Sequence, residues 1–227
     1  MSGQILPIAP AVSIQRGRRV LDPSERTAEI LFGLIMVLTF TGSLSVAEAG
    51  RDDVRAMLVG AVGCNLAWGI IDGVLYLMGS LADRNRNLAL HRAVANASGV
   101  AEAETAISEA VPPVIASALQ SADFERVRQQ VRALPSPPRA RLTASDWQGA
   151  FGVFLLVFLS TFPVALPFVT MQSASSAMRV SNAVAVVMLF LAGGLYGRAV
   201  GLAPWAVGIS MVLLGSALVA LTIALGG

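Results

Sequence analysis

Residues 56–82 read AMLVGAVGCNLAWGIIDGVLYLMGSLA and contain a single charged side chain, that of Asp72. Sixteen uncharged residues precede this aspartate from Ala56, and ten follow it as far as Ala82. A helix of about 20 predominantly apolar residues is long enough to cross the hydrocarbon core of a bilayer. We therefore predict that this stretch spans a membrane and carries a carboxylate within it.

The rest of the chain contains four more long uncharged runs, at residues 30–47, 147–178, 180–197 and 199–227. Of the 227 residues, 55% are hydrophobic and only 13% are charged, whereas a soluble domain has roughly 25% charged residues. We predict an all-α, polytopic membrane protein. Its five transmembrane helices are expected at about residues 29–49, 55–81, 148–170, 180–198 and 203–225.

The first apolar run begins only at residue 30, after a charged leader, and further spans follow it. This pattern argues against a cleaved signal peptide. The single cysteine, Cys64, lies within the second expected span. One cysteine cannot form an intrachain disulfide or a CxxC metal or redox site.

All sixteen basic residues are arginines, and their distribution predicts the orientation of the chain. Thirteen fall on the side that holds the N-terminus, and only Arg51, Arg55 and Arg179 fall on the other side. The positive-inside rule then places the N-terminus in the cytoplasm and the C-terminus outside. We expect an integral protein of a bacterial inner (plasma) membrane. No nucleic-acid partner is expected, because the arginines flank spans and lack interleaved aromatic residues.

We divide the chain into an N-terminal cytosolic tail (1–27), a transmembrane hairpin (28–82), a cytosolic helical segment (83–146) and three further spans (147–227). The sequence Asp22-Pro23-Ser24-Glu25 is typical of a helix start. Apolar residues from Ala89 to Val100 recur at helical spacing and predict that the second span continues into the cytosol.

Prolines divide the cytosolic helical segment. Pro112-Pro113 interrupts it, and Pro135-Ser136-Pro137-Pro138 ends a second amphipathic stretch. The segment has few large apolar side chains and would make a poor core alone. We expect it to pack on itself, on the membrane face or on a second copy of the chain.

Asp72 is the first candidate for a functional site, because a charged Asp at the centre of a membrane helix costs roughly 2.5–3.5 kcal/mol on insertion scales. Such groups usually face a polar interior and handle an ion, a proton or a substrate. The competing interpretation is a tilted helix in which Asp72 is hydrated near the interface. The polar and thioether groups of the first two spans form the predicted ion pathway: Asp72, Glu29, Asn65, Glu48 and Met78.

Carboxylates, amides and thioethers in proximity suit a divalent cation. The candidate metal ligands are Asp72, Glu29, Glu102, Glu104 and Glu109. For the last three, a solvated helix face is the competing interpretation, because arginines lie nearby. Methionines in spans usually only pack, as do glycines such as Gly201, Gly208 and Gly215, which are spaced by seven. His91 is expected on the surface. No HExxH, GxSxG or P-loop motif is present, so we do not expect an enzyme or a resident cofactor.

Several stretches resemble the vacuolar iron transporter (VIT) family. Residues 205–215 (WAVGISMVLLG) resemble its last helix, and Phe158-Leu-Ser-Thr-Phe-Pro163-Val-Ala-Leu-Pro167-Phe168 resembles its proline-containing third span. Leu189-Phe190, Gly193 and Gly197-Arg198 resemble its fourth span, and residues 41–45 (TGSLS) resemble the end of its first. The resemblance implies five spans, a cytosolic helical segment after the second, a homodimer, and transport of ferrous or manganous ions.

The chain departs from that family at functional positions. The family has an Asp-Gly pair in the first helix, where this chain has Phe32-Gly33 with Glu29 one turn earlier. In the second helix the family has a Glu where this chain has Asn65, and a Met where it has Gly73, next to Asp72. Its glutamate-rich cytosolic metal site is reduced here to the three glutamates named above, and its two prolines are spaced by three rather than four.

Three hypotheses about function follow from these observations. The first is a divalent-metal transporter that exports Fe²⁺ or Mn²⁺ from the cytoplasm, with proton coupling left open. The ion would be captured near Asp72 and Glu29, would pass between the first two helices of two subunits, and would be released near Glu48, Asp52 and Asp53. The alternative is a non-transporting membrane scaffold or regulatory protein with the same fold. Transport of another solute is a third, weaker hypothesis.

Overall fold

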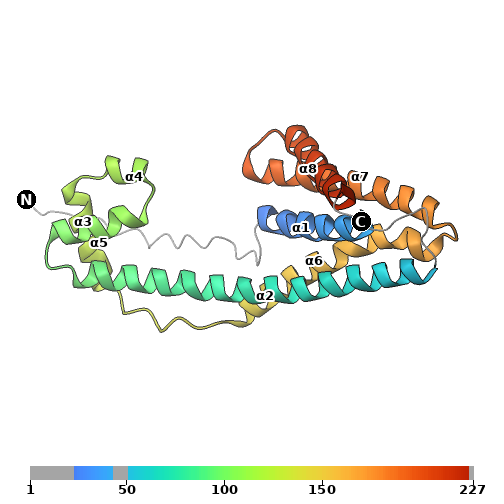
Figure 1. Cartoon of the computed structure of the whole chain (residues 1–227). Helices are drawn as coiled ribbons and strands as arrows, with labels where there is room; N and C mark the ends of the chain where they lie inside the picture. Colours follow the sequence, from blue (N-terminus) through green and yellow to red (C-terminus); the bar gives the residue numbers. More distant parts are fainter. Residues whose placement is uncertain (1–22, 43–50, 225–227) are drawn as a thin grey trace, which may run out of the picture.

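The computed structural model describes residues 23–42 and 51–224, and every regular element within these ranges is an α-helix (Figure 1). Eight helices follow one another along the described residues: α1 (Pro23–Gly42), α2 (Arg51–Asn96), α3 (Val100–Ala110), α4 (Pro113–Ala118), α5 (Ser121–Ala133), α6 (Ala144–Thr170), α7 (Ala174–Val200) and α8 (Pro204–Ala224). The predicted all-helical architecture is confirmed for this part of the chain.

Four of the described helices are long and apolar enough to cross a membrane. They cover Asp52–Asn96, Ala144–Thr170, Ala174–Val200 and Pro204–Leu221, and they support an integral membrane protein. The first of the five expected spans is not among them. Its described part, α1, ends at Gly42 and has charged residues at positions 25, 26 and 29.

The helix boundaries follow the local sequence closely. Helix α1 begins at Pro23, as the helix-start motif predicts. Helix α2 begins at Arg51, so residues expected in the turn between the first two spans are already helical. Helix α7 begins at Ala174, six residues before its expected start, because Ser173 caps it and accepts a hydrogen bond from the amide of Ser176.

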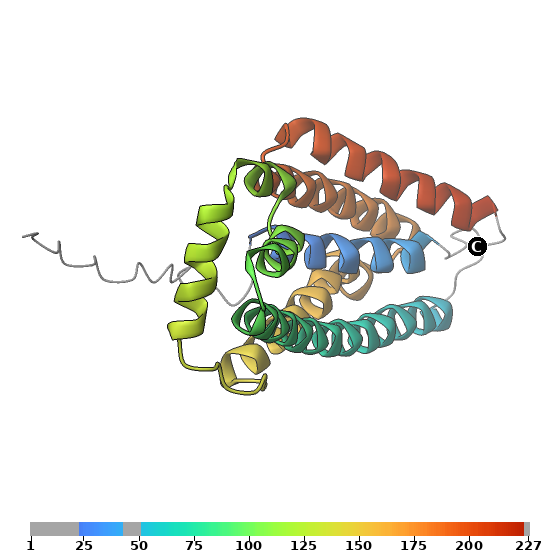
Figure 2. The same cartoon turned by 90° about the vertical axis from the view of Figure 1, so that its left-hand side faces the viewer.

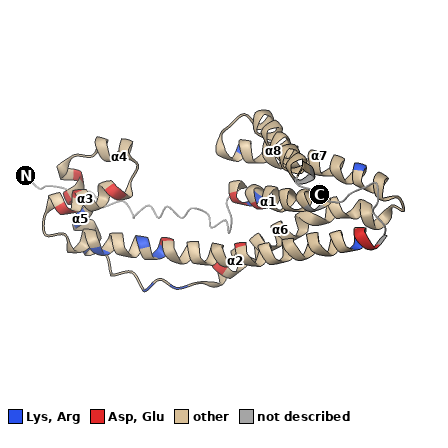
Figure 3. Ribbon diagram, in the orientation of Figure 1, with Lys and Arg blue, Asp and Glu red and all other residues tan. Residues whose placement is uncertain are grey.

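Helix α2 has 46 residues, and its length is therefore about 69 Å at 1.5 Å per residue. A bilayer core is about 30 Å thick. The predicted continuation of this helix past its apolar run is confirmed, because α2 extends to Asn96. Figure 1 shows α2 running under the other membrane helices and on to α3–α5. Charged residues are concentrated along the distal half of α2, on α3–α5 and at the ends of the membrane helices (Figure 3).

The interface between α2 and α6 runs the length of the membrane part. Residues at every fourth position of α2 are buried, namely Met57, Ala61, Asn65, Gly69 and Gly73, and this spacing places them along one face. Figures 1 and 2 show α1 lying among α2, α6 and α7, with α8 outermost on α7. The main membrane core is accordingly built around α1, by residues such as Leu34 and Val37, both fully buried.

Glycines set the close packing of α7 on α8. A Cβ at Gly208 would lie 2.8 Å from the carbonyl oxygen of Phe190, and one at Gly215 would lie 2.6 Å from Leu189. The predicted packing role of these two glycines is confirmed. Gly201 does not share it, because it caps α7 with φ of 76°, a left-handed conformation that favours glycine.

The distal helices α3–α5 gather at the end of α2 (Figure 2), and their buried side chains form a small separate core with it. Phe124 of α5 is 3% exposed and packs with Val94, Ala97, Ala103 and Ile107. Pro112 and Pro113 separate α3 from α4, and α5 ends before the proline-rich stretch, as predicted. The second amphipathic stretch is divided into two helices, α4 and α5.

Candidate functional site: polar groups between α1, α2 and α6

The centre of the site is the side chain of Asn65, which is fully buried where α1, α2 and α6 meet. Its Nδ2 donates hydrogen bonds to the carbonyl oxygen of Gly33 on α1, at 3.3 Å, and to Thr161 Oγ1 on α6. Its Oδ1 is buried and has no hydrogen-bond partner among the described residues. One amide therefore links three helices and still presents an acceptor oxygen.

Helix α1 can approach α6 at this level because residue 33 is a glycine. A Cβ at Gly33 would lie 2.0 Å from Ser160 Oγ and 2.7 Å from the carbonyl oxygen of Val157. On the side facing α2, Phe32 and Trp68 make an edge-to-face contact, with ring centroids 5.4 Å apart. The residue before this glycine, Phe32, is therefore an aromatic side chain that packs against α2, and not an acid.

Glu29 and Asp72 lie on the same side of the Gly33–Asn65 contact along the antiparallel α1–α2 pair, Glu29 one turn from it on α1 and Asp72 almost two turns from it on α2. Glu29 is partly buried and within electrostatic reach of both Asp72 and Glu25. Asp72 is also partly buried, and its Oδ2 has no hydrogen-bond partner in the described part of the chain. The two main carboxylates of the predicted pathway are therefore within electrostatic reach of each other.

Asp72 and Asn65 are seven residues apart on α2. Seven residues make almost two turns, so the two side chains lie on the same side of the helix, about 10 Å apart along its axis. Both carry a buried oxygen without a hydrogen-bond partner within the described ranges. Buried polar atoms are usually satisfied, so each of these two oxygens can still accept a hydrogen bond or coordinate a cation, and the Asp72 carboxylate can also bind a proton.

The polar region continues from Asp72 toward the distal end of α2. Tyr76, one turn further along, packs against Gly149 and is within electrostatic reach of Glu25 and Asp146. Asp146 is 6% exposed and forms an ion pair with Arg84 at 2.7 Å. The same carboxylate caps α6 by accepting hydrogen bonds from the amide and hydroxyl of Thr143, at 2.6 and 2.7 Å.

The other predicted pathway residues are not brought to this site by the described structure. Met78 is 62% exposed, and it lies six residues after Asp72, which places it on a different side of α2. Glu48 lies outside the described residues. Asp52 borders an outer pocket of about 750 Å³ between α2, α6 and α7, together with Arg55 and Gln172.

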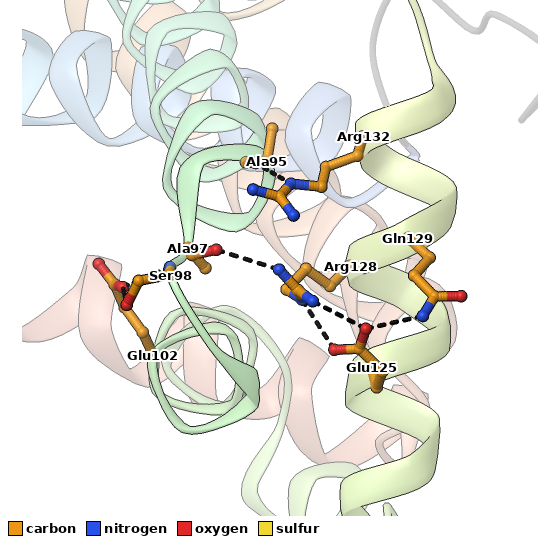
Figure 4. Close-up of polar contacts among 8 residues, drawn as sticks. All are labelled: Ala95, Ala97, Ser98, Glu102, Glu125, Arg128, Gln129 and Arg132. Atoms are coloured by element: carbon orange, nitrogen blue, oxygen red, sulfur yellow. Dashed lines mark hydrogen bonds and ion pairs between the residues drawn. The ribbon is translucent and has the colours of Figure 1, made fainter.

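The three glutamates of α3 are exposed and lie far along the chain from Asp72. Glu102 accepts hydrogen bonds from the amide and hydroxyl of Ser98, both at 2.8 Å, and these bonds hold its pKa below its usual value (Figure 4). Across residues 23–42 and 51–224, no group of three or more His, Cys, Asp or Glu side chains is arranged to hold a metal. The metal-ligand assignment for Glu102, Glu104 and Glu109 stays a prediction.

Sequence reasoning overlooked the contribution of α6. Ser160 and Thr161 are buried polar residues in an otherwise apolar helix, and this pair was a readable signal. Thr143 and Asp146 also have the spacing of a capping box. Their contacts with Asn65, Gly33 and Arg84 depend on how three helices pack, which no local pattern specifies.

Long apolar helices with a partly buried carboxylate among them, as in the described part of this chain, are typical of membrane proteins that move small ions or solutes. Residues 84–227, more than half of the chain, match the model of the VIT family. The chain therefore belongs to the VIT family, whose members are membrane transporters of metal ions. The matched region begins after Asp72, so it does not include Glu29, Asn65 or Asp72. No curated protein sequence matches the chain.

Proposed function

We propose that this protein transports Fe²⁺ or Mn²⁺ out of the cytoplasm, and that Asp72 and Glu29 capture the ion. The observation that carries the proposal is the buried Asp72 Oδ2, which has no hydrogen-bond partner among the described residues and lies within electrostatic reach of Glu29. A divalent cation between the two carboxylates would offset both their mutual repulsion and their desolvation. Oxygen ligands suit such an ion.

The proposed path uses the polar groups in their order along α2. The ion enters past Arg84–Asp146 and Tyr76, binds at Asp72 and Glu29, and moves on toward the free Oδ1 of Asn65. It is released near Glu48, Asp52 and Asp53. A carboxylate that gives up the ion can accept a proton in exchange, which is the basis of the proposed proton coupling.

We propose a homodimer with the path between the first two helices of each subunit, five spans, and the N-terminus in the cytoplasm. In addition to the four long apolar helices, α1 and the residues that follow it would form the first of these five spans. Thirteen of sixteen arginines lie on the cytoplasmic side in this orientation, in agreement with the positive-inside rule. A dimer would supply further ligands, since two carboxylates of one chain leave most of the coordination shell of a divalent ion to other donors.

The test is a flux measurement in liposomes that contain the purified protein. Uptake of Fe²⁺, Mn²⁺ and Co²⁺ is measured with and without a pH gradient, for the wild type, Asp72→Asn and Glu29→Gln. Asp83→Asn is the matched control, because Asp83 lies on the same helix, is exposed and pairs only with Arg86 in the described structure. We expect loss of flux in the first two variants and normal flux in the control.

Two results would contradict the proposal. Flux that survives Asp72→Asn would remove this carboxylate from the mechanism. Absence of flux for every ion tested, with folded wild-type protein, would favour the non-transporting scaffold. That second function has one observation in its favour, because Asn65 already uses its Nδ2 to link α1 and α6.

A further inference from the structure

A second polar site lies outside the membrane helices, between α2 and the connector that links α5 to α6. It is a pocket of about 580 Å³. Figure 1 shows the connector, residues 134–143, running back beside α2 toward the start of α6. The polar lining residues come from both segments: Arg84, Asn87 and His91 from α2, and Arg139, Arg141 and Thr143 from the connector.

The geometry of this pocket follows from the sequence on each side. The α2 residues 84, 87, 88 and 91 have the spacing that places side chains on one helical face. Pro137 and Pro138 stiffen the connector opposite them. Arg84 fastens the two walls together, because it donates a hydrogen bond to the carbonyl oxygen of Arg141 and pairs with Asp146.

The pocket is positively charged, and most of this charge is not neutralised by ion pairs with described residues. Its lining contains three arginines and one histidine, and none of the lining residues is acidic. Arg84 is neutralised by Asp146, but neither Arg139 nor Arg141 forms an ion pair with any described residue. His91 was expected on the surface, yet it is only partly exposed, and its Nε2 is buried without a hydrogen-bond partner in the described ranges.

The Arg84 end of the pocket falls within the expected depth of the lipid headgroups, and its His91 end extends beyond them. Arg84 and His91 are two and nine residues beyond Ala82, where the uncharged stretch of α2 ends, so they are about 3 and 14 Å past the apolar segment. The headgroup layer extends roughly 5–8 Å beyond each side of the hydrocarbon core. Trp147 begins the uncharged run of α6 next to Asp146 and is 60% exposed, as is typical of an aromatic residue at the membrane interface.

We propose that this pocket binds a phosphate group, and that the phosphate is the headgroup of an anionic phospholipid. A guanidinium presents a planar set of donors that matches phosphate oxygens, and Arg139 and Arg141 are unpaired within the described structure. His91 Nε2 and Asn87 offer further polar contacts from the α2 wall. Basic pockets at the cytoplasmic ends of membrane helices bind phospholipid headgroups in this way.

The bound lipid would connect the distal helices to the membrane. The connector leads from α5 to α6 and forms one wall of the pocket. A headgroup held between the connector and α2 would therefore fix the start of α6 relative to the long helix. This function is separate from ion transport and does not depend on Asp72.

The experiment uses the full-length protein in detergent and measures retained lipid by native mass spectrometry, with added phosphatidylglycerol or phosphatidylcholine. The test variant is Arg139→Ala/Arg141→Ala. The matched control is Arg92→Ala/Arg198→Ala, which removes two exposed arginines outside the pocket lining and changes the net charge equally. We expect the affinity for phosphatidylglycerol to fall roughly 30-fold in the test variant and to remain unchanged in the control.

Two further measurements distinguish a lipid headgroup from free phosphate, and the role of the guanidinium from that of its charge. Millimolar inorganic phosphate should not displace the bound lipid, and Arg139→Lys/Arg141→Lys should retain part of the affinity because it keeps the charge but loses the planar donors. Equal lipid loss in the test and control variants would overturn the proposal. Binding of inorganic phosphate without binding of phosphatidylglycerol would overturn the assignment to a lipid.

Discussion

Asn65 of α2 and Gly33 of α1 are joined by a hydrogen bond of 3.3 Å from the side-chain Nδ2 to the main-chain carbonyl oxygen. Glu29 lies one turn from this contact along α1 and Asp72 almost two turns from it along α2, so the contact fixes the spacing of the two helices near both carboxylates. It exists because a glycine lets α1 lie against α6 while the amide of Asn65 reaches across from α2. The proposed ion site and the close approach of α1 to α6 at Gly33 are therefore neighbours.

The close approach at Gly33 predicts a large effect of a small substitution. Gly33→Ala places a Cβ against Ser160 Oγ and the backbone of Val157, and overpacking of this kind costs about 1–3 kcal/mol. The free energy of unfolding is measured by titration of the micelle-bound protein with sodium dodecyl sulfate. Gly63→Ala is the control, because nothing lies within 4 Å of its Cβ position, and its stability should stay equal or rise slightly. An unchanged free energy of unfolding in Gly33→Ala would contradict the close contact of Gly33 with α6.

Asn65→Ala should destabilise the membrane core by about 1 kcal/mol, because it removes hydrogen bonds between three helices. The same titration measures the effect. Thr161→Ala combined with Asn65→Ala should cost less than the sum of the single variants, because they share one interaction. Additive costs would show that the two side chains do not interact.

The ion pair between Arg84 and Asp146 should couple α2 to the start of α6. Asp146 is buried and also caps α6 through Thr143, so Asp146→Ala should cost about 2 kcal/mol. Arg84→Ala should cost less, since its side chain is 31% exposed. A double-mutant cycle measured by unfolding should give a favourable coupling between the two residues, and a coupling of zero would contradict the pair.

The contact of α5 with α2 should weaken in acid. Arg128 and Gln129 donate hydrogen bonds to Glu125 and lower its pKa from 4.5 to about 2, while Arg128 also bonds to the carbonyl oxygen of Ala97 (Figure 4). Because the folded pKa is the lower one, this contribution to stability is complete above pH 4.5 and is lost as the pH falls toward 2.

The measurement for that prediction is the thermal loss of helical circular dichroism between pH 6 and pH 2.5, for the wild type and Glu125→Gln. The melting temperature of the wild type should exceed that of the variant at neutral pH, and the difference should shrink as the pH falls. A difference independent of pH would contradict the role of the carboxylate. Glu109→Gln, an exposed residue of α3, serves as the control.

The family of the chain was readable from short stretches of the sequence, and the match over residues 84–227 confirms it. The proximity of Asp72 and Glu29 could be predicted only in part from the sequence. Their order along two antiparallel helices predicted that they could face one vestibule, and the packing of α1 on α2 brings them within electrostatic reach. Nothing local predicted that Asn65 would bond to Gly33, because that depends on a third helix.

The sequence by itself determined the helices, since hydrophobic run length, prolines and capping residues act locally, and these features explain why α2 continues to Asn96 and why α5 ends at Ala133. It also shows that a carboxylate, at position 72, interrupts the long uncharged run of α2. Only the tertiary structure decided which side chains meet it. Glycine contacts, the buried amide of Asn65 and the basic pocket beside the connector arise from the packing of distant segments, where the gain from fitting surfaces together outweighs any local preference.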